Sequence, residues 1–478
     1  MTDEPAVRRD RFTGGPARSF LSSLAADSRI FAADIAVDQA HVVMLAEQEI
    51  VADETAGLIL EALAAVETAG HAELPSGEDV HEAIETAVID RIGSDGGRMH
   101  TARSRNDEVA ACLRYRLRAD LLGLLDRLCD ARSRLQAVAA AESMTPMPGY
   151  THLQPAQPTT VAHWALSYEA ALARDTSRLR DAYDRLNRSP LGAAAFAGTP
   201  FPIDRERTAD LLGFTGVVEN ATDAVSTRDF LLEVAGALAT TAVTVSGLAA
   251  DVIEFVSRGL MTVDDDYAST SSIMPQKKNP DTLELARARA GDASAALSAL
   301  VTTLTGLPRA YNRDLQRVTT HFWEAVDETG PAVAAAVGAV ATAEWPSDQL
   351  AAAATEGFAA ATGVADRLAM AGVPFRTAHE LVAEVAAAAA GTPSLEAVQA
   401  AVSELAVELD DETLATVLTA EGSVAMRDSR GGPAPAAVAA QRDRAETTLA
   451  DHRDATDDRR QRVDAAATRL ATAVDRYV

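Results

Sequence analysis

The sequence is poor in lysine and cysteine. Its 478 residues include only two lysines, Lys277 and Lys278, and every other basic side chain is arginine. Cys112 and Cys129 are its two cysteines, and they form no CxxC pair. This scarcity argues against a disulfide framework and is typical of a reducing compartment. We therefore expect both cysteines to be core residues.

Targeting and membrane segments are also missing. No charged segment followed by an apolar run stands at the N-terminus, so neither a signal peptide nor an N-terminal anchor is predicted. The longest apolar stretch without a charge, residues 234–250, contains Thr, Ser and Gly. Its composition favours a helix buried in a bundle over a membrane span. We expect a cytoplasmic protein without a membrane partner.

Basic residues are in the minority, with 43 Lys and Arg against 70 Asp and Glu and a net charge of −27. Phosphate backbones are bound by clustered Lys and Arg, and no basic stripe is present, which argues against a nucleic-acid partner. An acid excess destabilises a compact chain by self-repulsion, a balance known from halophiles. Together with the shortage of lysine it indicates a salt-rich cytoplasm. A high-GC genome, which favours arginine and alanine codons, is the alternative cause.

Several cofactor motifs are absent. No GxGxxG opens a helix after a strand, and no glycine precedes either lysine as in a P-loop. His81-Glu82 and His379-Glu380 lack the second histidine of a helical zinc site. We therefore expect no metal and no cofactor. A Schiff base on Lys277 with pyridoxal phosphate or a carbonyl substrate is chemically possible, but a strand-rich scaffold for it is missing.

What is present reads as helix. Apolar residues recur at helical spacing, and no segment keeps the two-residue period of a strand. The clearest series is Leu113, Leu117, Leu121, Leu124, Leu125 and Leu128. Proline and glycine interrupt the pattern in predicted loops at 146–158 and 190–202 and in a break at 306–308.

We predict an all-α fold in three parts. An N-terminal helical domain covers residues 1–103, a central bundle of long helices covers 104–349, and a C-terminal helical domain covers 350–478. The segment 441–476 has mixed charge and is predicted to be a solvated helix.

The two lysines lie in the segment 271–281, directly before a predicted helix at 282–304. Because arginine serves everywhere else, this position indicates a need for a compact ammonium group, although two exposed loop lysines are the alternative. Asn279 is the predicted N-cap, and Pro280 is the predicted first helical residue. Free N–H groups and the dipole at a helix N-terminus favour an anion such as a carboxylate or phosphate.

This segment, Ser-Ser-Ile-Met-Pro-Gln-Lys-Lys-Asn-Pro-Asp, resembles the signature loop of the fumarase/aspartase superfamily. Its Gln-Lys-Lys-Asn form is similar to the argininosuccinate lyase family. Further blocks resemble that family in its own order, at residues 78–81, 100–109, 149–154, 197–205, 228–230 and 311–316. Residues 372–376 and 379–380 extend the resemblance into the C-terminal third.

The resemblance implies a three-domain helical fold whose central bundles associate as a homotetramer with shared active sites. It also implies the reversible cleavage of argininosuccinate to fumarate and arginine in arginine biosynthesis. A proton must leave the carbon next to a carboxylate before the C–N bond breaks. Such a site needs a base, fixed cations or dipoles for the developing charge, and an acid for the leaving nitrogen.

By this resemblance, five residues have catalytic roles. Ser271 is the expected base, and Lys277 and Asn279 stabilise the charged intermediate together with the following helix terminus. His152, paired with Glu284, is the expected acid or proton relay. The resemblance further implies that His152 and Ser271 reach one site from different subunits.

The substrate contacts implied by the resemblance are Ser23, Asp27, His81, Arg105, Asn106, Thr151, Arg228, Tyr311 and Gln316. Two of them have simpler alternatives. Asn106 could cap the helix that follows it, and Arg228 could form an ordinary ion pair with Asp229.

Three positions depart from the family pattern. Thr270 and Ala102 stand where the family has glycine, so those turns must tolerate a side chain. Thr319 replaces a lysine that would meet a substrate carboxylate, and Arg317 is the nearby alternative cation.

Other members of the superfamily, such as fumarase or adenylosuccinate lyase, are the second hypothesis. The Gln-Lys-Lys-Asn form and the Ser-Arg-Asn-Asp block argue against them. A non-catalytic, crystallin-like homologue is the third, and the joint presence of Ser271, His152, Lys277 and Glu284 argues against it.

Overall fold

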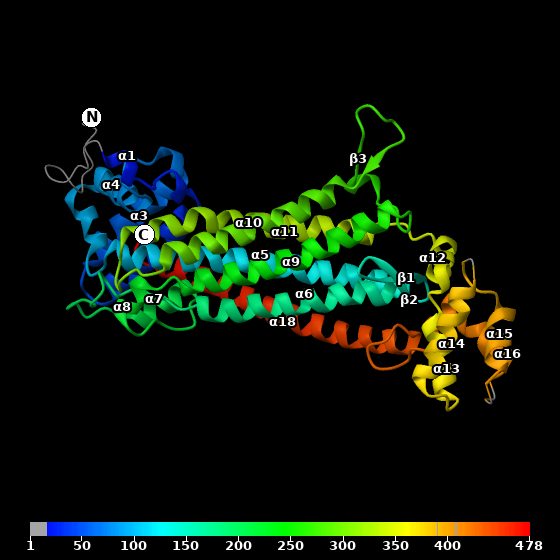
Figure 1. Cartoon of the computed structure of the whole chain (residues 1–478). Coiled ribbons are helices and arrows are strands. Elements are labelled where there is room, and N and C mark those ends of the chain that lie inside the picture. Colours follow the sequence, from blue (N-terminus) through cyan, green and yellow to red (C-terminus); the bar gives the residue numbers. More distant parts are fainter. Residues whose placement is uncertain (1–16, 390, 406, 408) are drawn as a thin grey trace.

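The computed structural model describes residues 17–389, 391–405, 407 and 409–478. A bundle of long helices forms the body of the molecule, with a smaller group of helices at each end (Figure 1). Only two short two-stranded sheets occur in the described chain. The predicted all-α class is confirmed.

The N-terminal helices pack around α2 (Phe31–Glu47), α3 (Asp53–Ala69) and α4 (Val80–Ile92). Short pieces connect them: α1 (Arg18–Leu21), η2 (Ala26–Arg29), η3 (His71–Glu73) and η4 (Gly93–His100). Most of α2 is apolar and buried, but Asp34, Asp38 and His41 are buried with it. Their spacing of four and three residues places them on one face of the helix.

The bundle is built from α5 (Arg105–Ala141), α6 (Val161–Leu186), α9 (Asp229–Ser257), α10 (Asp281–Leu304) and α11 (Val318–Ala341). The short α7 (Arg205–Leu212), α8 (Ala221–Ser226), η5 (Asp265–Tyr267) and η6 (Arg313–Arg317) lie in its connections. All six leucines of the predicted series in α5 are buried. Both cysteines are buried and unpaired, as predicted.

The apolar stretch 234–250 lies in α9, the one described helix that is long and apolar enough to cross a membrane. Half of its apolar window is buried inside the chain. Near its end, Asp251 accepts hydrogen bonds from Trp164 Nε1 at 2.9 Å and from the Tyr168 hydroxyl at 2.7 Å. These contacts tie α9 to α6, as expected for a helix inside a bundle.

The predicted loop at 146–158 was wrong in part, because it folds as a hairpin of β1 (Pro146–Thr151) and β2 (Gln154–Thr160). Proline is tolerated in such a ladder where its missing N–H is not needed. A bulge between Pro148 and Tyr150 accommodates Gly149. A Cβ at that glycine would meet the Gln157 carbonyl oxygen at 2.4 Å.

The C-terminal segment contains α12 (Ser347–Thr355), η7 (Glu356–Phe358), α13 (Ala361–Met370), α14 (Phe375–Ala388), α15 (Leu395–Ser403), α16 (Asp411–Val417) and α17 (Ala420–Ala425). Residues from Phe358 to Val417 form a hydrophobic core of their own. The proposed division at residues 104 and 350 stays a prediction.

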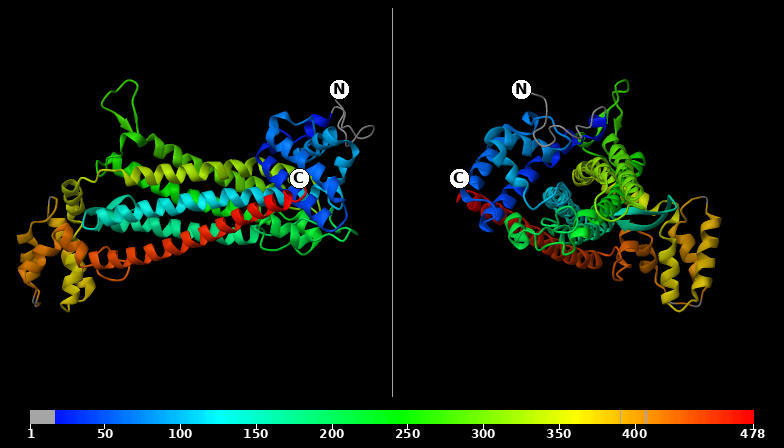
Figure 2. Two further views of the ribbon diagram at one scale, coloured as in Figure 1. Left: turned by 180° about the vertical axis from the view of Figure 1, so that it is seen from behind. Right: turned by 90° about the vertical axis from the view of Figure 1, so that its left-hand side faces the viewer.

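The last helix, α18 (Pro435–Val474), returns along the bundle, so the chain's C-terminus lies at the same end as the N-terminal helices (Figures 1 and 2). The predicted helix at 441–476 is confirmed and most of its residues are exposed or half-buried, but one narrow face packs against the bundle. Leu449, Ala466 and Leu470 are buried, and His452 accepts a hydrogen bond from the buried Arg132 of α5 at 2.8 Å. Only a few apolar residues form this face, and the rest of the helix is mostly polar or charged. Composition alone therefore does not predict that the helix packs against the bundle.

The helix order places neighbouring loops at opposite ends of the bundle. At 1.5 Å per residue, α5 spans about 55 Å between Arg105 and the β1–β2 hairpin. Likewise α9 spans about 43 Å between Arg228 and the segment that contains Ser271. Figure 1 shows the β1–β2 hairpin and β3 far from the N-terminal helices.

Candidate active site

A cavity of about 380 Å³ lies where the N-terminal helices meet the near end of the bundle. It is lined by η2, the start of α4, the start of α5, the N-cap of α9 and the η6 region. Eight of the nine predicted substrate-binding residues line it: Ser23, Asp27, His81, Arg105, Asn106, Arg228, Tyr311 and Gln316. The ninth, Thr151, lies in the distant hairpin.

Carboxylates line one part of the cavity. The Ser23 hydroxyl donates to Asp27 Oδ2 at 2.7 Å, and the Val80 backbone N–H also donates to this oxygen. Burial nevertheless raises the pKa of Asp27 above its usual range. Asp79 caps α4 by accepting from the Glu82 backbone N–H at 2.8 Å. The short helix η2 and the start of α4 are thereby fixed together.

Cations line the same cavity. Arg105 Nη1 lies 3.4 Å from Asp79 Oδ2, and Arg313 Nη2 lies 2.6 Å from Glu78 Oε1. Gln316 donates to the Leu21 carbonyl at 3.1 Å. These contacts hold η6 against the N-terminal segment and leave a cavity lined by charges of both signs.

Neither simple alternative for Asn106 and Arg228 holds. Ser104 caps α5 in a capping box with Asp107, while the Asn106 amide donates to the Ala195 carbonyl at 3.1 Å. Arg228 Nη1 donates to the Val225 and Thr227 carbonyls rather than to Asp229. Burial lowers the pKa of Arg228 to about 10, so it is still a cation at neutral pH.

His152 occupies the turn of the β1–β2 hairpin. Thr151 pairs with Gln154, so His152 and Leu153 form a two-residue turn with φ of 56° and 57°. Such a turn normally uses Asn or Gly at both positions, because other side chains are strained there. Strain of this kind clusters at functional sites. The turn exposes His152 to solvent.

The signature segment forms a protruding hairpin of β3 (Ser269–Thr270) and β4 (Lys278–Asn279) (Figure 2). The Ser271 hydroxyl oxygen accepts from the Met274 backbone N–H at 3.0 Å and from Ile273 at 3.3 Å. Two such donors stabilise negative charge on that oxygen. A serine that acts as a base needs its alkoxide form to be stabilised. These two backbone N–H groups of the same loop can supply that stabilisation.

The two lysines differ in their contacts. Lys278 Nζ lies 2.6 Å from Asp265 Oδ1, which joins β4 to η5 just before the hairpin. Within the described residues, no ion pair or hydrogen bond is recorded for the Lys277 ammonium group, and Lys277 is exposed. Lys277 is thus the lysine available to a ligand.

The predicted cap of α10 was one residue off. Pro280 is the N-cap, and Asn279 lies in β4 because the hairpin ladder pairs it with Ser269. Asp281 starts the helix and accepts from the Ser269 hydroxyl. Glu284 follows in the first turn and is exposed.

A single chain therefore does not bring the predicted site together. Eight of the predicted substrate-binding residues line the cavity, whereas Thr151 and the five catalytic candidates belong to two hairpin regions far along the bundle. Among the described side chains, no recorded hydrogen bond joins His152 to Glu284. Their pairing stays a prediction.

The departures from the family pattern differ in cost. Ala102 has a φ of 64°, so this turn requires the left-handed backbone conformation that glycine adopts freely. Thr270 is in the extended β3 and carries no such strain. Thr319 lines the cavity in place of the lysine, and the nearby cation that lines it is Arg313 rather than Arg317.

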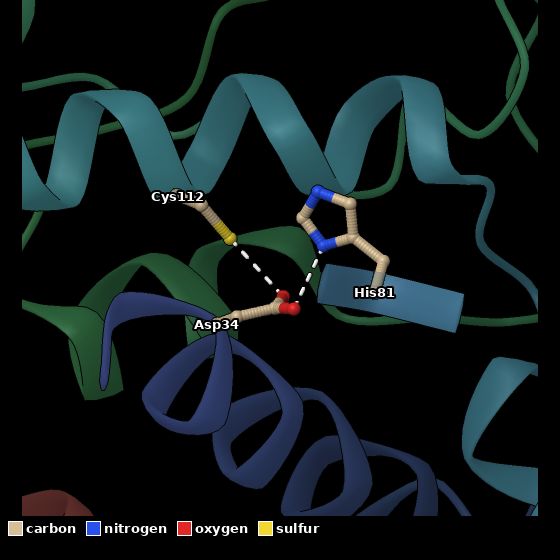
Figure 3. A group of neighbouring side chains, drawn as sticks. All are labelled: Asp34, His81 and Cys112. Atoms are coloured by element: carbon tan, nitrogen blue, oxygen red, sulfur yellow. Dashed lines mark hydrogen bonds and ion pairs between the residues drawn. The ribbon is translucent and has the colours of Figure 1, made fainter. Parts of the chain in front are cut away.

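Residues that the motifs did not single out lie behind His81. Asp34 Oδ2 accepts from His81 Nδ1 at 2.8 Å, and Asp34 Oδ1 accepts from the Cys112 thiol at 3.2 Å (Figure 3). All three side chains are buried and could supply metal ligands. Here they are bonded to one another, and Arg103 Nη2 lies 3.0 Å from the neighbouring Glu108. The positive charge of Arg103 would repel a metal ion bound in this cluster.

One signal could have revealed this cluster. In the printed sequence, Asp34, Asp38 and His41 are polar residues on one face of an otherwise apolar helical segment. Buried acids of this kind are rare unless they are paired.

Two family models match the chain. A lyase model matches residues 17–294, and the model of the argininosuccinate lyase C-terminal region matches residues 358–425. An argininosuccinate lyase of Haloarcula marismortui is 64% identical, covering 100% of this chain and 97% of that protein. The chain belongs to the argininosuccinate lyase family. It is therefore a lyase, and the predicted family and enzyme class are confirmed.

Other comparisons agree with this membership of the argininosuccinate lyase family. A family member from Halobacterium salinarum is 65% identical and covers 95% of this chain and 93% of its own. The crystal structure of EDDS lyase in complex with formate has a TM-score of 0.85 and 32% identity, covering 97% of this chain and 96% of that chain. The predicted fumarase/aspartase-like fold is confirmed.

Proposed function

We propose that this chain catalyses the reversible cleavage of argininosuccinate to fumarate and arginine, as part of arginine biosynthesis. The observation that carries the proposal is the mixed charge of the cavity. Arg105, Arg228 and Arg313 suit the carboxylates of argininosuccinate, while Asp27 and Asp79 suit its ammonium and guanidinium groups. A cavity of about 380 Å³ is of the size that encloses a small-molecule substrate.

The chemistry requires groups that the cavity does not contain. Ser271 would remove the proton from the carbon next to the carboxylate, with its alkoxide form stabilised by two backbone N–H groups. Lys277 and the N-terminus of α10 would stabilise the charge that develops on that carboxylate. His152 would then protonate the leaving guanidinium nitrogen as the C–N bond breaks. Fumarate and arginine result.

The separated site supports a homotetramer in which neighbouring chains supply the two hairpin regions. Exposed apolar side chains on α9 and α10 support such an assembly: Val243 is 64% exposed, Leu285 is 54% exposed and Val301 is 49% exposed. Exposed apolar side chains of this kind would be covered if the bundles of neighbouring chains packed along α9 and α10. Bundles that pack side by side would bring the hairpin of one chain towards the cavity of another.

The function is tested by following fumarate absorbance with purified protein at high salt. We expect fumarate from argininosuccinate, and little from adenylosuccinate or malate under the same conditions. Fumarate from either rival alone would identify a different superfamily lyase. Absence of fumarate from all three, with folded tetramers present, would indicate a non-catalytic homologue.

A further inference from the structure

We propose that Asp34 is a positioning residue that holds His81 as an imidazolium, with Nε2 directed into the cavity to bind a carboxylate of the substrate. The proposal rests on the proposed lyase function for the identity of the ligand. It assigns a role to Asp34, a residue outside every motif block of the chain.

The first support is geometric. Asp34 on α2 lies between His81 of α4 and Cys112 of α5, and each carboxylate oxygen accepts one hydrogen bond (Figure 3). The His81 bond uses Nδ1, so the ring's second nitrogen points away from the carboxylate (Figure 3). His81 lines the cavity, and no described residue is recorded as a hydrogen-bond partner of its Nε2. That nitrogen is the one a ligand can reach.

The second support is the charge around the ring. His81 Nδ1 lies 2.8 Å from Asp34 and 3.8 Å from Glu108 Oε1. Burial alone lowers the pKa of His81, but these two carboxylates outweigh it and raise the pKa to about 10. The pKa of Asp34 is lowered in return: burial raises it, but the His81 charge prevails. Both partners are therefore ionised across neutral pH.

Other charged groups near the ring do not reverse this balance. Arg103 opposes a proton on His81 but is paired with Asp38 and Glu108. Burial raises the pKa of Asp38 to about 7 and that of Glu108 well above its usual range, so Asp34, whose own pKa is lowered, is the main carboxylate that holds the proton on His81. The other charged or titratable residues that line the cavity are Asp27, Glu78, Asp79, His100, Arg105, Arg228, Tyr311 and Arg313.

An imidazolium here has a use in recognition. Thr319 stands where the family pattern has a lysine, and the Arg105 and Arg313 guanidinium groups are already paired with Asp79 and Glu78, which leaves Arg228 as the other cation of the cavity. A neutral imidazole can donate from one nitrogen only, and Asp34 already takes that donor at Nδ1. Protonation makes Nε2 a second donor that carries charge. Asp34 thus determines whether His81 can bind an anion.

The test measures protonation and kinetics separately. Imidazole resonances of the full-length tetramer, labelled at histidine, are followed from pH 5.5 to 9, and the His81→Asn variant assigns the His81 signal. We expect wild-type His81 to stay protonated throughout. In Asp34→Asn the imidazole should deprotonate at or below its ordinary pKa of about 6.5.

The kinetic consequence should appear in KM. One pH unit above a pKa of about 6.5, roughly one imidazole in ten keeps its proton, so KM of Asp34→Asn should rise about tenfold between pH 5.5 and 7.5 relative to wild type. The change in kcat should be smaller. Cys112→Ala is the matched control, since it removes a contact to Asp34 but keeps the charge. It should retain a protonated His81 and a wild-type pH dependence of KM.

Two results would overturn the proposal: a wild-type His81 that is neutral at pH 8, or an Asp34→Asn protein that keeps both the proton and the pH-independent KM. The wild-type titration decides the matter even if Asp34→Asn does not fold. It also needs no substrate. Failure of argininosuccinate cleavage would therefore count against the proposed function, while the titration still judges the Asp34–His81 pair.

Discussion

The two ends of the bundle are built in opposite ways. At the cavity end, the side chains are part-buried, cross-linked by ion pairs and supported by a second layer that includes Asp34. At the other end, His152 and Lys277 are exposed on hairpins, and the Lys277 ammonium group has no ion pair or hydrogen bond with the described residues. The first end is organised to bind within one chain. The second end exposes His152 and Lys277, which would need the surface of another chain to complete a site.

The largest expected effect concerns the hairpin end. Lys277→Arg should lose activity almost as badly as Lys277→Met, on the order of 10²–10³ in rate, because a planar guanidinium cannot replace a point ammonium in a closed site. Thermal stability should not change, since the residue is exposed in the single chain. Initial-rate assays and thermal melts measure both.

Lys278→Arg is the matched control for this substitution. Its pairing with Asp265 is a simple ion pair that arginine can also form, so activity should be close to wild type. Near-normal turnover in Lys277→Arg would remove Lys277 from the proposed chemistry.

A second prediction concerns salt, which should affect the exposed acidic surface but not the buried Asp34–His81 pair at the cavity end. With 70 acids against 43 bases, the exposed surface repels itself at low ionic strength, and molar salt shortens the Debye length to about 3 Å. The unfolding midpoint should therefore rise in concentrated KCl. The buried Asp34–His81 pair is shielded from ions, so its protonation should not shift. A midpoint that stays constant or falls with salt would contradict the halophilic interpretation.

The smallest expected effect compares Ala102 and Thr270, two positions where the family pattern has glycine. Ala102→Gly should stabilise the fold by about 0.5–1 kcal/mol, because it removes left-handed strain that exceeds the entropy cost of glycine. Thr270→Gly, in an extended strand, should destabilise it by roughly the same amount. Denaturant titrations measure both free energies of unfolding. Equal signs for the two substitutions would mean that backbone strain does not separate these positions.

The same two ends show what a sequence can predict. Helical periodicity and motif blocks were enough to predict the all-α fold, the buried leucines of α5 and eight residues that line one cavity. Those blocks could not show that residues 151 and 271 lie some 40–55 Å of helix away from the cavity, because distance depends on helix length and direction. Asp34 was missed because its partners, His81 and Cys112, are distant in sequence.

Local geometry was also harder to predict than element type. The hairpin at 146–160 was hidden by its prolines, which normally argue against strands. The cap of α10 moved from Asn279 to Pro280 because strand pairing took priority over capping preference. Packing of α18 along the bundle depends on a few buried residues, such as Leu449, in a mostly charged helix.

The central claim is that one active site combines hairpins from different chains with the cavity end. It is tested most directly by unfolding His152→Asn and Ser271→Ala proteins together and refolding them as mixed oligomers. If the two residues reach each site from different chains, random equal mixing restores about a quarter of the sites. Lyase activity should then rise to roughly a quarter of wild type, far above either variant refolded alone. Activity at the single-variant background, with mixed tetramers seen by native mass spectrometry, would contradict the shared site.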